Sequence, residues 1–235
     1  MEMEQKILLV EDEEDISNLL KLYLMDSGYI VDSFDNGQDA FEHIKTKNMI
    51  YDLAILDVMI PGINGFELCK KIREEYFYPI IMLTAKVEDL DKITGLTIGA
   101  DDYITKPFNP LEVMARVKTQ LRRYKRYNEQ SSSIKQVEEY DIRGLKINKT
   151  THTCFLFDEQ IDLTPIEFSI LWYLIENQGR VISSEELFEK VWGEKYIDNN
   201  NTVMAHIARL REKLKEPVKK PKFIKTVWGV GYKVE

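Results

Sequence analysis

Residues that could carry out phosphate or metal chemistry stand at the ends of short apolar runs in the first half of the chain. Each run has three to five residues and ends in, or is followed by, an acidic, hydroxyl or amino side chain. These are Glu11 and Asp12 after Lys6–Val10, Asp57 after Leu53–Leu56, Thr84 at the end of Ile80–Thr84, and Lys106 after Tyr103–Thr105. If the runs are neighbouring parallel strands, their carboxyl ends meet at one edge of a sheet, and these side chains converge there.

Three carboxylates at close range repel one another, and a hard divalent cation relieves that repulsion. Oxygen ligands with open positions suit Mg²⁺, which keeps several waters and tends to share a phosphate. A carboxylate beside Mg²⁺ can attack a phosphoryl group and form an acyl phosphate. Lys106 would supply a point charge for the phosphate, and Thr84 would supply a hydroxyl donor. The sequence therefore predicts Mg²⁺-dependent phosphoryl chemistry at this edge.

The segments between the runs predict the elements that hold these side chains. The first helical segment has one apolar stripe, formed by residues that recur at intervals of three and four, namely Ile16, Leu19, Leu20, Tyr23 and Leu24. Two later segments repeat the pattern, with Phe66, Cys69 and Ile72 in one and Met114, Val117 and Leu121 in the other. Five strands alternating with five helices predict an α/β fold with a doubly wound parallel sheet. The strand order 2-1-3-4-5 makes the first and third strands neighbours, as the cluster requires.

Each of these residues also has a purely structural interpretation. The acidic stretch from Glu11 to Asp15 could favour the positive N-terminus of the next helix. Thr84 could be an ordinary strand-end hydroxyl, and Lys106 could be a surface lysine. The coincidence of all these features at strand ends in one half of the chain favours the chemical interpretation.

The same stretches resemble the receiver domain of two-component response regulators. The resemblance rests on Glu11-Asp12, on Asp57 within Leu-Asp-Val-Met-Ile-Pro-Gly, on Thr84-Ala85, and on Gly99–Phe108, and it extends over about residues 5–124. It implies that a sensor histidine kinase phosphorylates Asp57. It also implies that Glu11, Asp12, Asp57 and the main-chain carbonyl of Met59 hold Mg²⁺. Thr84 and Lys106 are expected to contact the phosphoryl group, Tyr103 to act in the switch, and the Lys106–Pro107 bond to be cis.

The resemblance further implies a homodimer on phosphorylation. In relatives the fourth helix, the fifth strand and the last receiver helix pair across a two-fold axis through ion pairs. The matching positions in this chain are Lys92, Asp101, Asp102, Glu112, Arg116 and Arg123. The structural alternative is a solvated charged face, because exposed ion pairs contribute only about 0–1 kcal/mol each.

Composition limits the class of protein. The chain has 235 residues, 44% hydrophobic and 31% charged, which is typical of a globular protein of one or two domains. Its two cysteines, Cys69 and Cys154, argue against a disulfide framework, and the acidic start does not resemble a signal peptide, so we expect a cytoplasmic protein without a membrane segment. The net charge is -8, yet residues 201–235 hold 9 basic against 3 acidic residues. A basic end is the electrostatic pattern expected of a phosphate-backbone contact.

A polar stretch divides the chain. Residues 128–133 read Asn-Glu-Gln-Ser-Ser-Ser, which is typical of a flexible linker. The predicted organisation is a receiver domain at 1–125, a linker at 126–137, and a second domain at 138–235.

The second domain begins with alternating patterns that predict short antiparallel strands, followed by a turn at 158–160 and a further strand at Ile161–Leu163. Thr164-Pro165-Ile166-Glu167 is a strong helix start, and a second start follows at Ser183. A third helix carries the apolar stripe Val203, Ile207, Leu210 and Leu214, so Ala205, Ala208, Arg209 and Glu212 are predicted to face outward. Small residues with Arg on an outer face suit a helix in the major groove of DNA, although an ordinary amphipathic helix has the same pattern.

Two apolar runs near the end of the chain flank a turn and predict a β-hairpin at 223–232. With the three helices it predicts a winged helix-turn-helix. Residues 138–235 resemble the DNA-binding domain of the OmpR/PhoB subfamily, with Asn201–Leu214 as recognition helix and Lys225–Tyr232 as wing. The assigned DNA contacts are Asn201, Thr202, Ala205, Ala208, Arg209, Arg211, Lys225, Thr226 and Trp228. Relatives often carry Arg in place of Ala208 and of Trp228, and Trp228 could pack on a sugar in the minor groove or belong to the wing core.

These features together predict a phosphorylation-controlled transcription factor that binds promoter DNA, as direct repeats by family analogy, and that works with RNA polymerase. Within the subfamily, the chain most resembles regulators of the VanR type, which govern glycopeptide-resistance operons. Two alternatives stay open. An aspartyl-phosphate phosphatase is disfavoured because Met59 stands where such an enzyme needs a second Asp, and a receiver that binds only proteins is disfavoured by the basic C-terminal segment.

Overall fold

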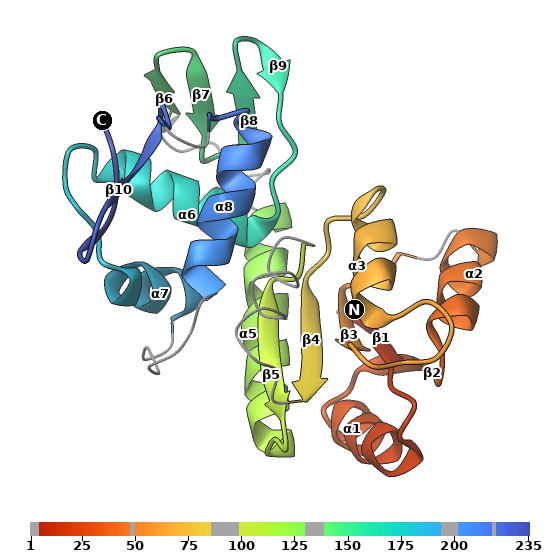
Figure 1. Cartoon of the computed structure of the whole chain (residues 1–235). Helices are drawn as coiled ribbons and strands as arrows, with labels where there is room; N and C mark the ends of the chain where they lie inside the picture. The colour runs from red at the N-terminus through yellow and green to blue at the C-terminus, as the bar shows by residue number, and fades with distance from the viewer. Residues whose placement is uncertain (1–4, 48–49, 86–98, 130–138, 194–201, 218–219) are drawn as a thin grey trace. The chain divides into compact units, whose positions relative to one another are not determined.

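The computed structural model describes residues 5–47, 50–85, 99–129, 139–193, 202–217 and 220–235 (Figure 1). The chain divides into two compact units, Met1–Tyr124 and Lys125–Glu235. Within the described ranges, no helix has both the length and the apolar composition needed to cross a bilayer.

The first unit is built on a five-stranded parallel sheet. Its strands, in the spatial order β2-β1-β3-β4-β5, are β1 (Lys6–Val10), β2 (Ile30–Phe34), β3 (Leu53–Asp57), β4 (Ile80–Ala85) and β5 (Asp102–Lys106). Each neighbouring pair is parallel, and Val10 on β1 pairs with Leu56 on β3. The predicted strand order is confirmed. The central strand β3 is buried at every residue, which is why its sequence is continuously apolar up to Asp57.

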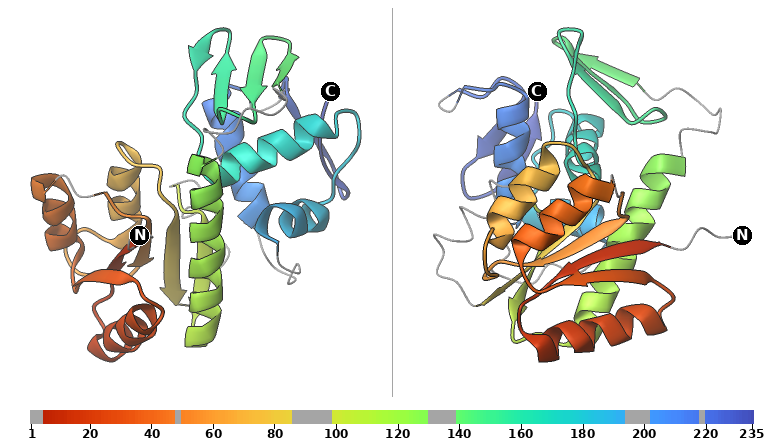
Figure 2. Two further views of the ribbon diagram at one scale, coloured as in Figure 1. Left: turned by 180° about the vertical axis from the view of Figure 1, so that it is seen from behind. Right: turned by 90° about the vertical axis from the view of Figure 1, so that its right-hand side faces the viewer.

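Helices cover both faces of this sheet (Figure 2). The helices α1 (Glu14–Asp26) and α5 (Pro110–Glu129) pack on Ile7, Leu9 and Ile55, whereas α2 (Gly37–Lys47) and α3 (Gly65–Arg73) pack on Leu8, Val10 and Leu56. Alternate residues of each strand therefore supply two separate cores. The predicted fourth helix of the receiver, which would lie between β4 and β5, falls outside the described residues. The helix α5 continues to Glu129, so the first four residues of the predicted linker are helical.

One buried ion pair fastens α3 to the start of β5. Arg73 Nη2 donates to Asp101 Oδ2 at 2.6 Å, and Asp101 is only 1% exposed. The same guanidinium donates to the carbonyl oxygens of Gly99 at 2.8 Å and Tyr78 at 2.7 Å. Asp101 also accepts from the backbone N–H of Ile80 at 2.9 Å. Asp101, predicted for the dimer face, is therefore buried with its carboxylate bonded inside the receiver unit, and its part in a dimer stays a prediction.

The second unit starts with a four-stranded antiparallel sheet of β6 (Glu139–Ile142), β7 (Leu145–Asn148), β8 (Thr153–Leu156) and β9 (Glu159–Gln160). The strand predicted at Ile161–Leu163 is wrong, because left-handed backbone at Phe157 and Asp158 makes the turn earlier and puts β9 at Glu159.

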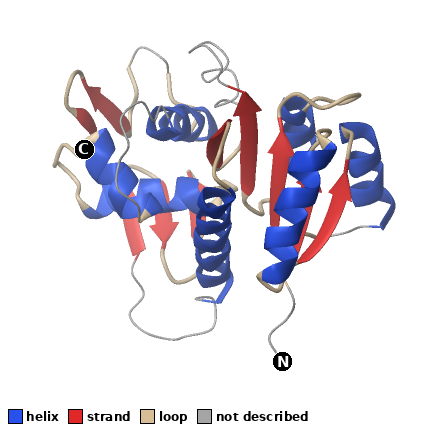
Figure 3. Ribbon diagram, turned by 90° about the horizontal axis from the view of Figure 1, so that it is seen from below, coloured by secondary structure: helices blue, strands red, loops and turns tan. Residues whose placement is uncertain are grey.

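The rest of the unit has three helices, α6 (Pro165–Glu176), α7 (Ser184–Trp192) and α8 (Thr202–Lys213), and the hairpin of β10 (Ile224–Val227) with β11 (Gly231–Val234) (Figure 3). The predicted capping box is confirmed, because Thr164 accepts from the Glu167 N–H and the Glu167 carboxylate accepts from the Thr164 N–H. The apolar stripe of α8 enters one core with α6, α7 and both strands of the hairpin.

The Arg73–Asp101 pair allows a direct test of its structural role. We expect Arg73→Ala to lower the free energy of unfolding by about 3–5 kcal/mol, because the buried Asp101 carboxylate would lose the opposite charge of the guanidinium. Arg122→Ala, on the exposed face of α5, is the matched control and should change it by less than about 0.5 kcal/mol. Urea unfolding of the full chain gives both values, and similar losses for the two variants would contradict the assignment.

Candidate phosphoacceptor site and DNA-binding surface

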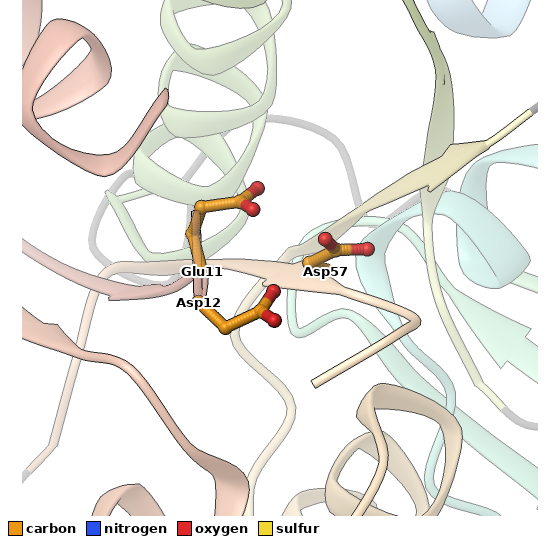
Figure 4. A group of neighbouring side chains, drawn as sticks. All are labelled: Glu11, Asp12 and Asp57. Atoms are coloured by element: carbon orange, nitrogen blue, oxygen red, sulfur yellow. The ribbon is translucent and has the colours of Figure 1, made fainter. Parts of the chain in front are cut away.

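Three carboxylates meet at the carboxyl ends of the adjacent strands β1 and β3 (Figure 4). Glu11, Asp12 and Asp57 each offer an oxygen, and these oxygens lie within 4.8 Å of one another. Glu11 and Asp57 are buried, and Asp12 is exposed. The cluster forms because Val10 and Leu56 are paired in register, so the next residues of the two strands emerge side by side.

The neighbouring backbone is packed tightly around Asp57. A Cβ on Gly65, the first residue of α3, would lie 2.0 Å from the carbonyl oxygen of Asp57, so only glycine fits there. The Gly65 N–H donates to the carbonyl oxygen of Val58 at 3.1 Å. The Met59 N–H donates to Asp57 Oδ1 at 3.1 Å, which turns the loop containing Met59 toward the acidic cluster.

Lys106 lies at the end of β5 and reaches the cluster with its ammonium group. Its Nζ lies 2.7 Å from Asp57 Oδ2, 2.8 Å from Glu11 Oε1 and 3.0 Å from Glu13 Oε1. Burial alone would lower the pKa of Lys106, but the hydrogen bonds that its ammonium group donates to Asp57, Glu11 and Glu13 outweigh it and raise that pKa. Lys106 is therefore a fixed positive charge at Asp57.

Glu13 is the contact that the sequence analysis missed. Its only sequence signal is its place one residue after Asp12, in an acidic stretch where several side chains could have made the contact.

The cluster carries more negative charge than Lys106 balances. The pKa of Glu11 is raised to about 7, because burial and, less strongly, the charge of Asp57 raise it more than the hydrogen bond from Lys106 lowers it. Glu11 Oε2 is also buried and has no hydrogen-bond partner among the described residues. A buried oxygen without a donor, beside two more carboxylates, fits a hard cation such as Mg²⁺.

The two predicted switch residues lie on the neighbouring strands. Thr84 is buried near the end of β4, one residue beyond the pairing of Asp57 with Leu83, and its hydroxyl donates to the carbonyl oxygen of Ala85 at 2.9 Å. Tyr103 is half-buried on β5 and packs against the core beneath α2 and α3.

The remaining residues predicted for a dimer face differ in burial and in their partners within the receiver. Asp102 is 2% exposed, and both of its carboxylate oxygens accept from Arg116 Nη1 at 2.9 Å. Arg116 also pairs with the half-exposed Glu112 at 3.0 Å. Asp102 is thus bonded within the receiver unit, whereas Glu112, Arg116 and Arg123 retain accessible surface, and the dimer face stays a prediction. Lys92 lies outside the described residues.

The outer face of α8 differs from the predicted one. Ala205 and Arg209 are only 5% and 4% exposed, so their predicted place on the outer face is wrong, and Thr202 is buried as well. These residues form, with His206, a second buried stripe beside the apolar one, and the His206 ring centroid lies 5.4 Å from that of Trp192 on α7. Asn201 lies outside the described residues.

The exposed stripe of α8 contains Met204, Ala208 and Glu212, with the half-buried Arg211 on its edge. Ala208 and Arg211 were predicted as DNA contacts, whereas Met204 was placed only on a flank. Met204 is 45% exposed, so this stripe presents a large apolar side chain beside Ala208.

The β10–β11 hairpin presents its tip to solvent. Trp228 is 90% exposed and Val230 is 56% exposed, so Trp228 does not belong to the core of the hairpin. Lys225 and Thr226, on β10, are half-buried.

The sheet order, the acidic cluster with its lysine, and the helical trio with a terminal hairpin define a class of protein. Residues 7–118 match the response regulator receiver domain, and residues 158–234 match the family described as transcriptional regulatory protein, C terminal. The chain belongs to the two-component response regulators of the OmpR/PhoB type, which join a receiver domain to a DNA-binding domain.

Among individual relatives, the chain is 59% identical to the regulatory protein VanRc of Enterococcus gallinarum, over 99% of this chain and all of the relative. It is 53% identical to the regulatory protein VanR of Enterococcus faecium with the same coverage. A solved structure of a RitR mutant superposes with a TM-score of 0.71 at 30% identity and covers 98% of this chain and 99% of that one.

The raised pKa of Glu11 makes Mg²⁺ binding depend on pH. A carboxyl group whose pKa is higher in the folded than in the unfolded state destabilises the metal-free fold as pH rises from about 4.5 to about 7. Mg²⁺ binds only the ionised carboxylate, so its binding competes with a proton on Glu11. We expect the Mg²⁺ affinity to be about tenfold weaker at pH 6 than at pH 8. Thermal shifts in MgCl₂ series measure it. Glu11→Gln should remove this dependence and Glu14→Gln should keep it, so a pH-independent affinity of the unchanged chain would refute the assignment.

Proposed function

We propose that this protein is a transcription regulator switched by phosphorylation of Asp57, with a sensor histidine kinase as phosphoryl donor. The observation that carries the proposal is the buried Asp57 carboxylate, which is shared between a cluster fit for a divalent cation and the ammonium group of Lys106. The positive charges of Lys106 and of a bound cation would stabilise the negative charge of a phosphoryl group that arrives at this oxygen.

The chain's own residues would act at defined atoms during the transfer. An Asp57 carboxylate oxygen forms the new bond to phosphorus while the phosphorus–nitrogen bond to the kinase histidine breaks, so the phosphoryl group ends as an acyl phosphate. Lys106 Nζ, already 2.7 Å from Asp57 Oδ2, stabilises the added negative charge. Glu11, Asp12, Asp57 and the Met59 carbonyl would hold Mg²⁺, which neutralises charge on the phosphoryl oxygens when it is bound.

The buried Thr84 hydroxyl would report the phosphoryl group to the rest of the receiver. It now donates to the carbonyl oxygen of Ala85, and turning it toward a phosphoryl oxygen would free that carbonyl. The half-buried Tyr103 on the neighbouring strand would then repack. Because the phosphoryl group stays on the protein's own side chain, we propose phosphoacceptance rather than turnover of a separate substrate. Met59 also leaves no second Asp for an acid at the phosphatase position.

The proposed output is a homodimer bound to promoter DNA. Glu112, Arg116 and Arg123 are accessible for contacts between receivers, with Lys92 as a further candidate, and residues 126–137 would connect the receiver to a DNA-binding domain at 138–235. Two domains on direct repeats would place α8 in successive major grooves about 10–11 bp apart and bring RNA polymerase to the promoter. DNA as the target implies that the protein works in the cytoplasm.

The proposed DNA-contact surface combines the exposed stripe of α8 with the tip of the hairpin. Ala208 is small enough to let the helix approach base edges, and Met204 can pack on a thymine methyl group. Lys225 and Thr226 can contact phosphates from β10, and the exposed Trp228 can pack on a sugar in the minor groove. Of the other assigned positions, Asn201 stays a candidate, whereas Thr202, Ala205 and Arg209 would act only through packing.

The target operon is proposed from the relatives alone. VanRc and VanR match the whole chain, so genes for glycopeptide resistance are the favoured targets. Genes recovered by chromatin immunoprecipitation would test this choice separately from the chemistry.

Phosphorylation should control DNA affinity. We expect BeF₃⁻ with Mg²⁺ to increase affinity for a DNA site selected from a random pool about tenfold or more, because dimerisation adds a second binding domain. Gel-shift titration measures the change. Asp57→Ala should abolish the increase, and Asp26→Ala, an exposed carboxylate on α1, should retain it. Equal affinities with and without BeF₃⁻ would refute phosphorylation control.

The exposed stripe of α8 gives a second prediction. Ala208→Asp places a carboxylate against DNA phosphates and bases, and we expect it to weaken binding at least about tenfold without lowering the melting temperature. Ala115→Asp adds the same charge at an exposed site on α5 and serves as the control. If both variants bind as the unchanged chain does, α8 is not the recognition helix.

A further inference from the structure

Two charged side chains, Arg211 near the end of α8 and Glu216 just after it, hold strand β10. Arg211 Nη2 donates to the carbonyl oxygen of Ile224 at 2.8 Å and to Thr226 Oγ1 at 2.8 Å, and its Nε donates to the same Ile224 oxygen at 3.1 Å. One planar guanidinium therefore binds a backbone acceptor and a side-chain acceptor on the same strand. A lysine could not reproduce this geometry, because its ammonium group lacks the rigid fork.

Glu216, just beyond the end of α8, binds the same segment through its backbone N–H groups, whereas Arg211 binds acceptors. Its Oε1 accepts from the backbone N–H groups of Phe223 and Ile224. Its side chain is 1% exposed, and Oε2 lies 3.8 Å from Arg211 Nε. Burial raises the pKa of Glu216, and the backbone hydrogen bonds oppose that shift, which is typical of a carboxylate withdrawn from water into a structural contact. Arg211, Glu216, Ile224 and Thr226 together form the α8–β10 contact.

The other strand of the hairpin is held separately. The N–H and carbonyl oxygen of Ile182 bond with the carbonyl oxygen and N–H of Tyr232, each at 2.8 Å. A Cβ on Gly231, next to Tyr232, would lie 2.0 Å from the Ile182 carbonyl oxygen, so the approach is as close as backbone allows. With β11 fixed at Ile182, the α8–β10 contact determines how the hairpin tip lies relative to the exposed stripe of α8.

We infer that Arg211 is a positioning residue that sets the hairpin for DNA binding and does not itself contact a base or a phosphate. This inference rests on the proposed function and replaces the DNA contact assigned to Arg211 from the sequence. Its three hydrogen bonds are made within the unit, and swinging the guanidinium onto DNA would leave the Ile224 oxygen and the buried Glu216 carboxylate without it.

The first test separates the two roles by charge and shape. Arg211→Lys keeps the charge but cannot make the forked contact, and Arg211→Gln removes both. We expect both variants to weaken DNA binding by about the same factor, of the order of five- to tenfold. Lys146→Gln is the matched control, because it removes the same charge from β7, where Lys146 pairs with the exposed Asp158 and no DNA contact is assigned. Near-normal binding by Arg211→Lys would overturn the inference.

The second test uses a protein that has lost two of the proposed hairpin contacts, the double variant Lys225→Gln and Trp228→Ala. If Arg211 acts through the hairpin, adding Arg211→Gln to this background should cost less than about twofold and leave the slope of log affinity against log salt unchanged. A direct phosphate contact would instead give the full loss and reduce the slope by about one. That result would overturn the inference.

A third measurement needs no DNA and keeps failure of this inference distinct from failure of the proposed function. Amide hydrogen exchange at residues 224–227 should accelerate in Arg211→Lys and Arg211→Gln, whereas exchange in α6 should not change. Unchanged exchange in β10 would overturn the inference even if DNA binding is established. If the unchanged chain binds no DNA while β10 exchange responds as expected, the positional role stands and the proposed function fails.

Discussion

The receiver unit is organised around buried negative charge that its own residues balance only in part. Glu11 and Asp57 lie on adjacent strands, and one ammonium group, that of Lys106, contacts both. Lys106 belongs to β5, two strands away from β3, so its side chain has to cross the end of β4. The residues at that end are Thr84 and Ala85, which are small enough to leave this path open. The sheet order, the size of these residues and the electrostatics of the site therefore depend on one another.

Most of this arrangement could be predicted because strands buried on both faces have an unmistakable sequence. A continuous apolar run such as Leu53–Leu56 indicates a central parallel strand, and the first polar residue after it marks the functional edge of the sheet. Glu13 could not be found in the same way. It is exposed, and its contact depends on where the Lys106 ammonium group settles, which is a tertiary fact with no local pattern.

Buried polar residues on α8 and around β5 were not predicted from the sequence, and both cases have one physical cause. Periodicity detects a buried stripe only when apolar residues form it, as Val203, Ile207 and Leu210 do. The second buried stripe of α8 contains Arg209, and Asp101 lies just before β5; both are residue types that a sequence pattern assigns to the surface. Burial of such residues is decided by partners distant in sequence, as with Arg73 and Asp101, which are 28 positions apart. Polar residues can thus complete a core and mimic a functional face in the sequence.

The same consideration changes the meaning of the basic C-terminal segment. Five of its 9 basic residues already have carboxylate partners in the DNA-binding unit, namely Arg211, Lys213, Lys215, Lys225 and Lys233. The distance is 2.7 Å for both Lys213 and Lys215. Lys215 pairs with an exposed glutamate, so it can exchange that partner for a phosphate at little cost. Lys213 pairs with Glu167, which is 1% exposed and would be left as an uncompensated buried charge. Net charge alone therefore overstates the positive charge available to DNA, and each lysine or arginine contributes to binding only as far as its internal partner can be left in water.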